Sequence, residues 1–276
     1  MIIDGKNIAQ EILDKLKVEV ATLPSQPIFC DILVGDDSVA ASYVALKGKR
    51  AEEIGVEFWL KQYPKEVTTE SLIKTIRELE AEPRLCGLII QLPLPEHIDK
   101  KAVIDAIDPK LDVDCIGREN SREFYEGRAR LVPPTAAAVV HLLQSLPTDL
   151  KEKKVLVIGQ GQLVGMPVTH LLKAYGHHVI TADKDTADLS VVSKDADVII
   201  SGTGKPGLIT ADLIKEGAII IDAGTAESDG GIAGDVDFES VKDKASFISP
   251  VPGGVGPVTV SKLLENVVLV AKSKIE

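Results

Sequence analysis

Residues 154–165 read KVLVIGQGQLVG, and this stretch decides the class of fold. Its apolar half predicts a buried strand, and the loop glycines Gly159, Gly161 and Gly165 lead into an apolar helix over 164–175. A loop of this kind leaves backbone N–H groups open at a helix N-terminus, where a pyrophosphate can bind. The spacing is GxGxxxG rather than the common GxGxxG, and ordinary strand–helix turns also use glycine. The stretch therefore predicts an α/β lobe and indicates a nucleotide site.

Strands and helices alternate along the rest of the chain as well, which predicts parallel sheets and an α/β fold. The predicted strands are 28–34, 56–60, 87–91, 155–158, 178–182, 197–201, 218–221 and 247–249. The predicted helices are 8–20, 39–54, 72–79, 136–146, 164–175, 209–214 and 260–270. We expect two lobes, a catalytic lobe over 1–132 that is completed by a C-terminal helix at 257–276, and a Rossmann-type dinucleotide-binding lobe over 133–256. The second lobe includes the helix that follows the two prolines at 133 and 134.

Composition excludes several classes of function. The 276 residues are 45% hydrophobic, with a net charge of −11, and the Lys/Arg clusters are short, so we expect neither a nucleic-acid nor a membrane partner. No apolar run reaches the roughly 18–20 residues that span a bilayer. The cysteines Cys30, Cys86 and Cys115 have no metal-ligand or disulfide spacing, which predicts no metal site. The expected location is the cytoplasm.

Residues 250–259 read PVPGGVGPVT and follow the predicted strand 247–249. Proline restricts φ and removes a donor, whereas glycine permits close backbone approach, so we expect neither a helix nor a central strand here. A rigid turn with few side chains at the end of a strand can offer bare N–H groups to a flat or anionic ligand. A plain strand-to-helix connection would have the same pattern.

Tyr43 and Lys47 are four residues apart on a predicted helix, and therefore share one face. A lysine that transfers protons near neutral pH needs burial or a neighbouring cation. The same spacing is also typical of a solvated surface pair, and of short-chain dehydrogenases. In those dehydrogenases the pair follows the nucleotide loop, whereas here it precedes the loop, which disfavours that family.

Gln91 and Asp114 are two further candidates near strand ends. Gln91 closes an apolar strand and is followed by Pro93 and Pro95, so it either caps the strand or contacts a ligand. Asp114, within DVD (112–114), is either a turn residue or a carboxylate that accepts two N–H bonds from a guanidine-like ring edge, such as that of a pterin.

These motifs together resemble the bifunctional methylenetetrahydrofolate dehydrogenase/cyclohydrolase family. The matching segments are YVALK (43–47), IQLPLP (90–95), DVD (112–114), VGMP (164–167), GKP (204–206), GDVD (234–237) and PVPGGVGPVT (250–259). They occur in the order of the family and cover essentially the whole chain.

The resemblance implies a role for each candidate. Lys47 matches the general acid/base, Tyr43 the aromatic packed on the folate, Gln91 the group that orients the lysine, and Asp114 the carboxylate that grips the pterin. The remaining substrate-binding positions are Leu92, Pro252, Gly253 and Gly254, and the cofactor-binding positions are Gly159, Gln160, Gly161, Gly165, Asp183, Lys184 and Thr225.

The implied activity has two steps in one-carbon metabolism and purine biosynthesis. 5,10-Methylenetetrahydrofolate loses a hydride to NAD or NADP, and water then opens the methenyl cation to 10-formyltetrahydrofolate. A homodimer is implied as well. Two alternatives stay open: a monofunctional dehydrogenase with weak or absent cyclohydrolase, and a non-catalytic folate- or nucleotide-binding protein. The presence of Lys47 and Gln91 disfavours the second.

Some positions depart from the family pattern. Gln160 stands where the family has arginine, Ala40 where it has serine and Cys115 where it has glycine, and a Pro-Cys-Thr-Pro segment reads PPTA (133–136). Without that arginine, a 2′-phosphate loses a cation. Asp183 ends the strand 178–182, where a carboxylate commonly binds a ribose 2′-hydroxyl, so NAD is favoured over NADP. The adjacent Lys184 can instead pair with a phosphate, and Asp183 can simply cap its turn.

Overall fold

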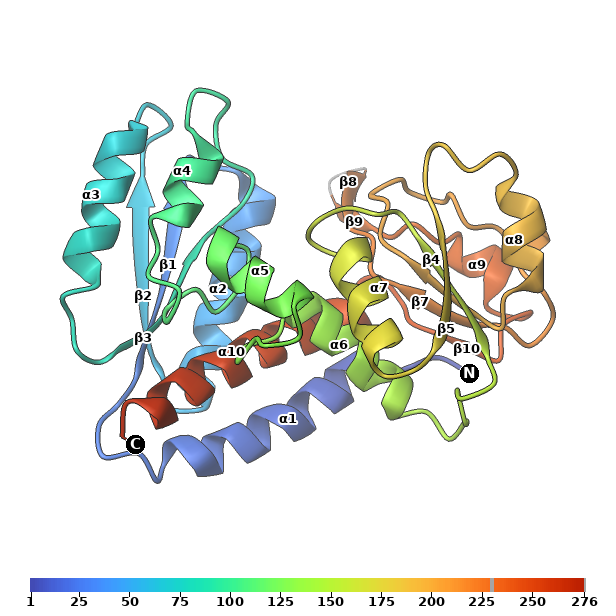
Figure 1. Ribbon diagram of the computed structural model, residues 1–276, viewed down its shortest axis with the longest axis horizontal. Helices are drawn as coiled ribbons and strands as arrows, with labels where there is room; N and C mark the ends of the chain where they lie inside the picture. The colour runs from blue at the N-terminus through green and yellow to red at the C-terminus, as the bar shows by residue number, and fades with distance from the viewer. Residues whose placement is uncertain (229–230, 276) are drawn as a thin grey trace. The chain divides into compact units, whose positions relative to one another are not determined.

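The computed structural model describes residues 1–228 and 231–275, and the chain divides into two compact units (Figure 1). The N-terminal unit contains Gln10–Pro134 and the chain from Val260 onward. The glycine-loop unit contains Met1–Ala9 and Thr135–Thr259. Both are α/β, which confirms the predicted fold class, and the chain returns to the N-terminal unit through its last helix.

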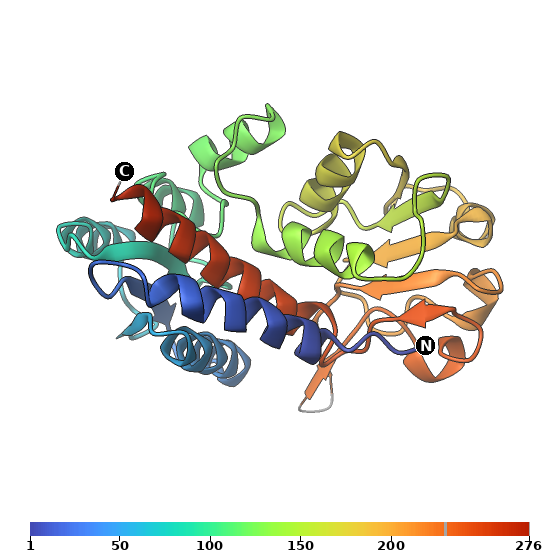
Figure 2. The ribbon, with the colours of Figure 1, turned by 90° about the horizontal axis from the view of Figure 1, so that it is seen from below.

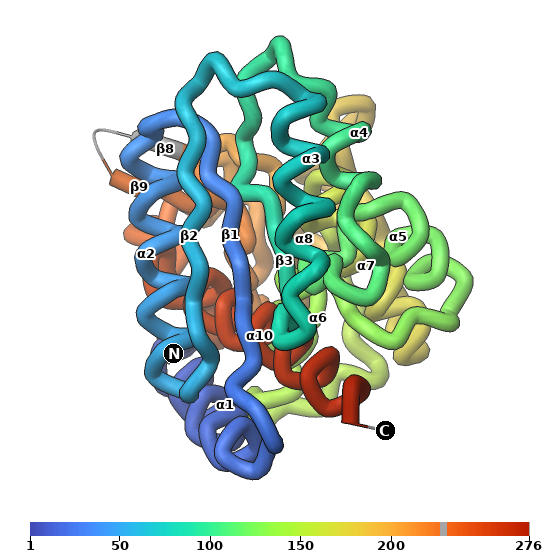
Figure 3. Tube along the Cα trace, turned by 90° about the vertical axis from the view of Figure 1, so that its left-hand side faces the viewer, coloured from blue at the N-terminus to red at the C-terminus, as the bar shows by residue number. Residues whose placement is uncertain are grey.

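The N-terminal unit is built on a parallel sheet with the strand order β2-β1-β3. The central strand β1 is wholly buried, which explains why its residues are apolar apart from Asp31. The connections from β1 to β2 and from β2 to β3 run in opposite directions along the sheet, so right-handed crossovers put α2 and α3 on opposite faces (Figure 3). The bounds are β1 Ile28–Val34, α2 Ser38–Glu53, β2 Glu57–Tyr63, α3 Thr69–Leu79, β3 Leu85–Ile90, α4 Lys100–Asp105 and α5 Arg118–Tyr125.

The long helices α1 (Gly5–Val20) and α10 (Val255–Ser273) each have residues in both units. The expectation that residues 250–259 contain no helix is wrong for their second half, because α10 begins at Val255. Pro257 therefore lies in the first helical turn. N–H groups there have no intrahelical acceptor, so a proline loses no hydrogen bond.

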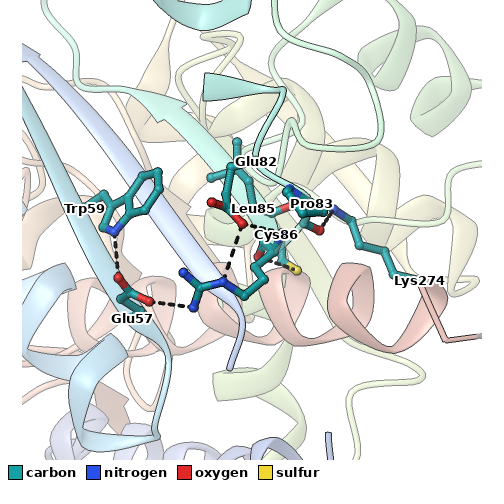
Figure 4. Close-up of polar contacts among 8 residues, drawn as sticks. Glu57, Trp59, Glu82, Pro83, Leu85, Cys86 and Lys274 are labelled. Carbon is teal, nitrogen blue, oxygen red and sulfur yellow. Dashed lines mark hydrogen bonds and ion pairs between the residues drawn. The ribbon is translucent and has the colours of Figure 1, made fainter. Parts of the chain in front are cut away.

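The C-terminal end of α10 is fixed to the start of β3 (Figure 4). Nζ of Lys274 donates to the carbonyl oxygens of Pro83 at 3.0 Å and Leu85 at 2.6 Å. Between those two residues, Arg84 forms an ion pair with Glu57 of β2 at 2.8 Å. The final helix is thereby joined to β3, and β3 to β2, at one end of the unit.

The glycine-loop unit has a parallel sheet with the strand order β10-β7-β6-β4-β5, whose strands lie side by side in Figure 2. Strand β4 has β5 on one side and β6 on the other, so the direction of winding reverses at β4, and α/β sheets bind ligands at such a switch point. The strands are β4 Lys154–Ile158, β5 His178–Ala182, β6 Val198–Ser201, β7 Ile219–Asp222 and β10 Phe247–Ile248, with a β8–β9 pair at Ala226–Ser228 and Gly231–Ala233. The helices are α6 Pro134–Gln144, α7 Gly165–Ala174, α8 Leu189–Asp195 and α9 Phe238–Val241.

Two features of this unit differ from the sequence-based expectation. The predicted helix over 209–214 is a single 3₁₀ turn, η1 Ala211–Leu213, because its flanking residues are extended. The start of the chain, grouped by sequence with residues up to 132, joins this sheet: Ile2 bridges to Ile248, and the amino group of Met1 donates to Ser246 at 2.7 Å. Among the described residues, no helix is long and apolar enough to cross a membrane.

Candidate functional site

Lys47 lies on the buried face of α2, which it shares with Val44, Gly48 and Ala51. Only 7% of its surface is exposed, so it is not the solvated surface lysine that its spacing from Tyr43 also allowed. The helix begins where the Asp37 side chain accepts from the N–H of Ala40 at 2.7 Å. That cap sets the first turn, and Lys47 follows on the face directed toward the sheet.

Two side chains hold the ammonium of Lys47 in place. Its Nζ donates to Oε1 of Gln91 at 2.6 Å and lies 2.6 Å from Oδ2 of Asp31. Gln91 directly follows β3, and its backbone N–H donates to Ile32 of β1 at 2.9 Å. The parallel pairing of β3 with β1 places Gln91 beside β1. There it meets Lys47 of α2, which lies 44 positions earlier in the chain.

Asp31 is the functional candidate that the sequence reasoning missed. It occupies the middle of β1 with no exposed surface, and among the described residues neither carboxylate oxygen accepts a hydrogen bond of regular geometry, while Oδ2 is held by its ion pair with Lys47. Burial raises the pKa of its carboxyl, and the charge of Lys47 opposes that rise. The available signal was an acidic residue inside the otherwise apolar strand FCDILV.

Asp114 lies close enough to feel the charges of this cluster. Burial, with the charges of Asp112 and Asp31 adding to it and the charge of Lys47 opposing it, raises the pKa of its carboxyl to about 6. Asp112 is itself buried, and its Oδ2 accepts from the N–H of Gly117 at 2.9 Å. Cys115 has a φ of 59°, in the left-handed region that favours glycine, so the tight turn at Asp112 holds Asp114 in position.

The other substrate candidates of this unit flank the lysine. Tyr43 is partly buried one helical turn before Lys47, and burial raises the pKa of its phenol. Nε2 of Gln91 donates to the carbonyl of Leu92 at 2.8 Å, and the Leu92–Pro93 peptide bond is cis. The structure thus gathers Tyr43, Lys47, Gln91, Leu92 and Asp114 within one unit.

The nucleotide loop has the close approach that its glycines predict. Gly159 has a φ of 86°, and a Cβ added to Gly165 would lie 1.7 Å from the carbonyl oxygen of Gly159. A Cβ on Gly161 would meet nothing within 4 Å, so that side of the loop is open. Gln160 bonds within the loop, since its Nε2 donates to Gly159 at 3.1 Å and its Oε1 accepts from Thr169 at 3.4 Å.

The residues after β5 and β7 complete this edge of the sheet. Asp183 and Lys184 are exposed after β5, and Thr225 is exposed after β7. Oδ1 of Asp183 accepts from the N–H of Asp185 at 3.0 Å, so the carboxylate does cap its own turn. Its exposure leaves the carboxylate accessible to a ligand as well.

Two buried carboxylates, which the sequence reasoning did not single out, organise the loops at the carboxyl ends of β6 and β7. Asp222 accepts from the N–H groups of Gly224, Asp235 and Val236 at 2.9–3.1 Å, and burial raises its pKa to about 6. Asp235 accepts from Ser201 at 2.7 Å and from the N–H groups of Thr203 and Lys205. The GDVD motif at 234–237 was the available signal.

Pro252, Gly253 and Gly254 belong to the glycine-loop unit. The Val251–Pro252 bond is cis, and Gly253 has a φ of 110°. A Cβ on Gly5 would lie 2.0 Å from the carbonyl oxygen of Gly254, so the start of α1 packs directly on this turn. Among the described residues no cluster of His, Cys, Asp and Glu could hold a metal ion.

Comparisons with known proteins agree with this geometry. The family models for the tetrahydrofolate dehydrogenase/cyclohydrolase catalytic domain and NAD(P)-binding domain match residues 3–114 and 133–275. The bifunctional protein FolD of Nautilia profundicola is 41% identical over 99% of this chain and 97% of its own. The bifunctional FolD crystal structure from Campylobacter jejuni has a TM-score of 0.94 at 36% identity, covering 99% of both chains. The Trypanosoma brucei enzyme, complexed with NADP and an inhibitor, has a TM-score of 0.95 at 35% identity, covering 100% of this chain and 98% of its own.

Proposed function

This chain belongs to the tetrahydrofolate dehydrogenase/cyclohydrolase family, and we propose that Lys47, held by Gln91, performs its proton transfers. The protein is an enzyme that oxidises 5,10-methylenetetrahydrofolate with a nicotinamide cofactor and hydrolyses the methenyl product to 10-formyltetrahydrofolate. The observation that carries the residue assignment is the buried Nζ of Lys47, 2.6 Å from Oε1 of Gln91. An amine restrained to one position can meet a substrate atom without first losing side-chain freedom.

The nicotinamide cofactor accepts the hydride, and the glycine-loop unit has the features to hold it. The open side at Gly161 and the helix N-terminus at Gly165 fit a pyrophosphate. Gln160, Asp183, Lys184 and Thr225 are the side chains proposed to contact the rest of the cofactor. We assign residues 133–256 to cofactor binding and residues 1–132, with the C-terminal helix 257–276, to folate binding and catalysis.

Asp114 is proposed to bind the pterin edge as an ionised carboxylate. Two N–H groups of a guanidine-like edge match the two oxygens of a carboxylate, and both bonds are charge-assisted. Tyr43 and Leu92 are proposed to contact the folate from either side of the lysine. Pro252, Gly253 and Gly254 are proposed as further folate-binding positions.

The preference of the enzyme is proposed to be NAD over NADP. Gln160 carries no charge and bonds within its own loop, so it offers a 2′-phosphate no cation. Asp183 is exposed at the end of β5, where a carboxylate binds a ribose 2′-hydroxyl and repels a phosphate. The adjacent Lys184 is a cation that works against this preference.

The enzyme is further proposed to be a homodimer, because closed twofold assemblies are the commonest oligomers. Its proposed location is the cytoplasm. Its product is a formyl donor, which suits a role in purine biosynthesis.

The reaction is tested by supplying 5,10-methylenetetrahydrofolate with each nicotinamide cofactor and following the absorbance of the methenyl cation. Appearance of the cation measures the dehydrogenase. Its decay, compared with the uncatalysed rate, measures the cyclohydrolase. If no cation forms with either cofactor, the proposed function and the residue roles that depend on it are contradicted.

A further inference from the structure

Asp31 interrupts an apolar face of the central strand. Side chains alternate along a strand, so Phe29, Asp31 and Leu33 point to the same side of β1. Leu33 packs with α2, and the ring of Phe29 lies 5.6 Å from that of Phe58. A carboxylate in this position has lost its hydration, and an apolar residue could pack there without that cost. The position therefore calls for an explanation other than packing.

The explanation is that the ammonium group of Lys47 cannot by itself accept a proton. Opening the methenyl ring with water releases one net proton, and an ammonium has no lone pair with which to accept it. Lys47 beside Asp31 is different, because Nζ can pass a proton to Oδ2, 2.6 Å away, as it takes another from water. We propose that Asp31 is a positioning residue that acts through Lys47, as the proton-accepting partner of its amine during ring opening. This inference rests on the proposed role of Lys47.

The step balances without any further reactant. The water oxygen forms a bond to the methenyl carbon and loses one proton to the Lys47–Asp31 pair. The bond from that carbon to N5 then breaks, and N5 takes the second proton of the water. The pair releases its extra proton to solvent. Nothing is oxidised or reduced, and the preceding hydride transfer needs no proton from the pair.

The groups that face Asp31 favour this role. Lys47 faces it from α2, the apolar Leu60 and Ile89 are its partners on β2 and β3, and Asp114 contributes a second negative charge from the loop between α4 and α5. Burial, with the charge of Asp31 adding to it, raises the pKa of the neighbouring Cys30 thiol to about 12, so Cys30 stays neutral. Burial also raises the pKa of Asp31 itself, so its carboxyl can take a proton closer to neutral pH than an exposed carboxyl can.

The test is Asp31→Asn, with kcat of each half-reaction measured at saturating folate across pH. Asparagine keeps the shape and an acceptor oxygen for Nζ but cannot store a proton. We expect cyclohydrolase kcat to fall about 10- to 100-fold, the scale of an acid–base contribution, with dehydrogenase kcat within about threefold of wild type. The acid limb of the pH profile of cyclohydrolase kcat should move to higher pH. In the variant the Lys47 amine alone must accept the proton, and an amine ordinarily keeps its own proton to higher pH than a carboxyl does. Asp31→Glu should recover part of the lost activity.

The matched control is Asp36→Asn, which removes the same charge from an exposed residue of the same unit and should change neither activity. Because Asp31→Asn leaves Lys47 without its charge partner, thermal unfolding is measured alongside. If the variant is unfolded, the double variant Lys47→Met/Asp31→Leu removes both charges. Its cyclohydrolase activity should then be no lower than that of Lys47→Met alone, because Asp31 acts only through Lys47.

Three results would overturn the inference: an equal fall of both half-reactions in folded Asp31→Asn, an unmoved acid limb, or a double variant lower than Lys47→Met. A wild-type enzyme that forms the methenyl cation but does not hydrolyse it would overturn it too. A wild-type enzyme that forms no cation contradicts the proposed function itself, and this result is read before any variant is compared.

Discussion

Nζ of Lys47 and Oε1 of Gln91 lie 2.6 Å apart in a partly buried site, in which Lys47 is 7% exposed and Gln91 is half-buried. A buried donor and acceptor at that distance restrain each other, because losing either partner leaves a buried polar group unsatisfied. The amine of the lysine is therefore held in one place before any substrate arrives.

Gln91→Leu should lower cyclohydrolase kcat by about tenfold, because the amine loses one of its two restraining partners. The dehydrogenase should fall less, since the hydride passes to the cofactor without proton transfer. Initial rates of both half-reactions check this, with Gln144→Leu, an exposed glutamine at the end of α6, as the matched control. An unchanged ratio of the two rates in Gln91→Leu would contradict the orienting role.

Asp183→Ser should shift the ratio of kcat/KM for NAD over NADP toward NADP by about tenfold, because the repulsion of a 2′-phosphate is removed. Serine can still accept the turn hydrogen bond from Asp185. The control is Asp185→Ser, an exposed carboxylate two residues away. A wild-type kcat/KM that is higher for NADP, or a ratio that stays fixed in Asp183→Ser, would show that Asp183 does not select the cofactor.

Asp114→Asn should change how stability depends on pH. The folded-state pKa of Asp114 is raised from 3.8 to about 6, so the folded protein holds a proton that the unfolded chain releases. Stability from this group is present below pH 3.8 and is lost as pH rises through about 6. The variant should therefore match wild type near pH 4 and exceed it by about 1–3 kcal/mol in unfolding free energy above pH 7.

Urea unfolding of both proteins at several pH values measures that difference. Asp14→Asn, an exposed aspartate of α1, supplies the control and should remain parallel to wild type throughout. A constant offset between Asp114→Asn and wild type from pH 4 to 8 would mean that Asp114 titrates normally in the folded protein.

Light scattering at micromolar concentration should give a mass near twice the 29.5 kDa of the chain, as expected for a homodimer. A mass that stays near 29.5 kDa at micromolar concentration would contradict the dimer.

Much of the fold was predictable because strands buried on both faces read as largely apolar runs, as β1 does apart from Asp31 and β7 does up to Asp222. The short helices α4 and α5 were not predicted, since one or two polar turns carry too little periodicity. For α4, the available local signal was the N-cap Asp99, whose side chain accepts from the N–H of Ala102 at 2.9 Å.

The site was partly predictable for a similar reason. Motif matches identified Lys47 and Gln91 as candidates, but YxxxK spacing by itself does not distinguish a buried lysine from a surface one. Burial depends on the pairing of β1 with β3, which is a long-range property of the sheet. Asp31 was missed because a single acidic residue in a strand does not by itself indicate a functional site. Its ion pair with Lys47 of α2 is visible only in the folded structure.

Lys47→Met tests the central claim most directly, in one stopped-flow trace of methenyl absorbance after methylenetetrahydrofolate and cofactor are mixed with enzyme. In wild type the absorbance should rise and then fall. In Lys47→Met it should rise and persist, with hydrolysis slower by about 100-fold or more, the contribution of a general acid/base. Lys49→Met, an exposed lysine of the same helix, should follow the wild-type trace. If Lys47→Met cleared the methenyl cation at close to the wild-type rate, Lys47 would not be the proton-transfer group.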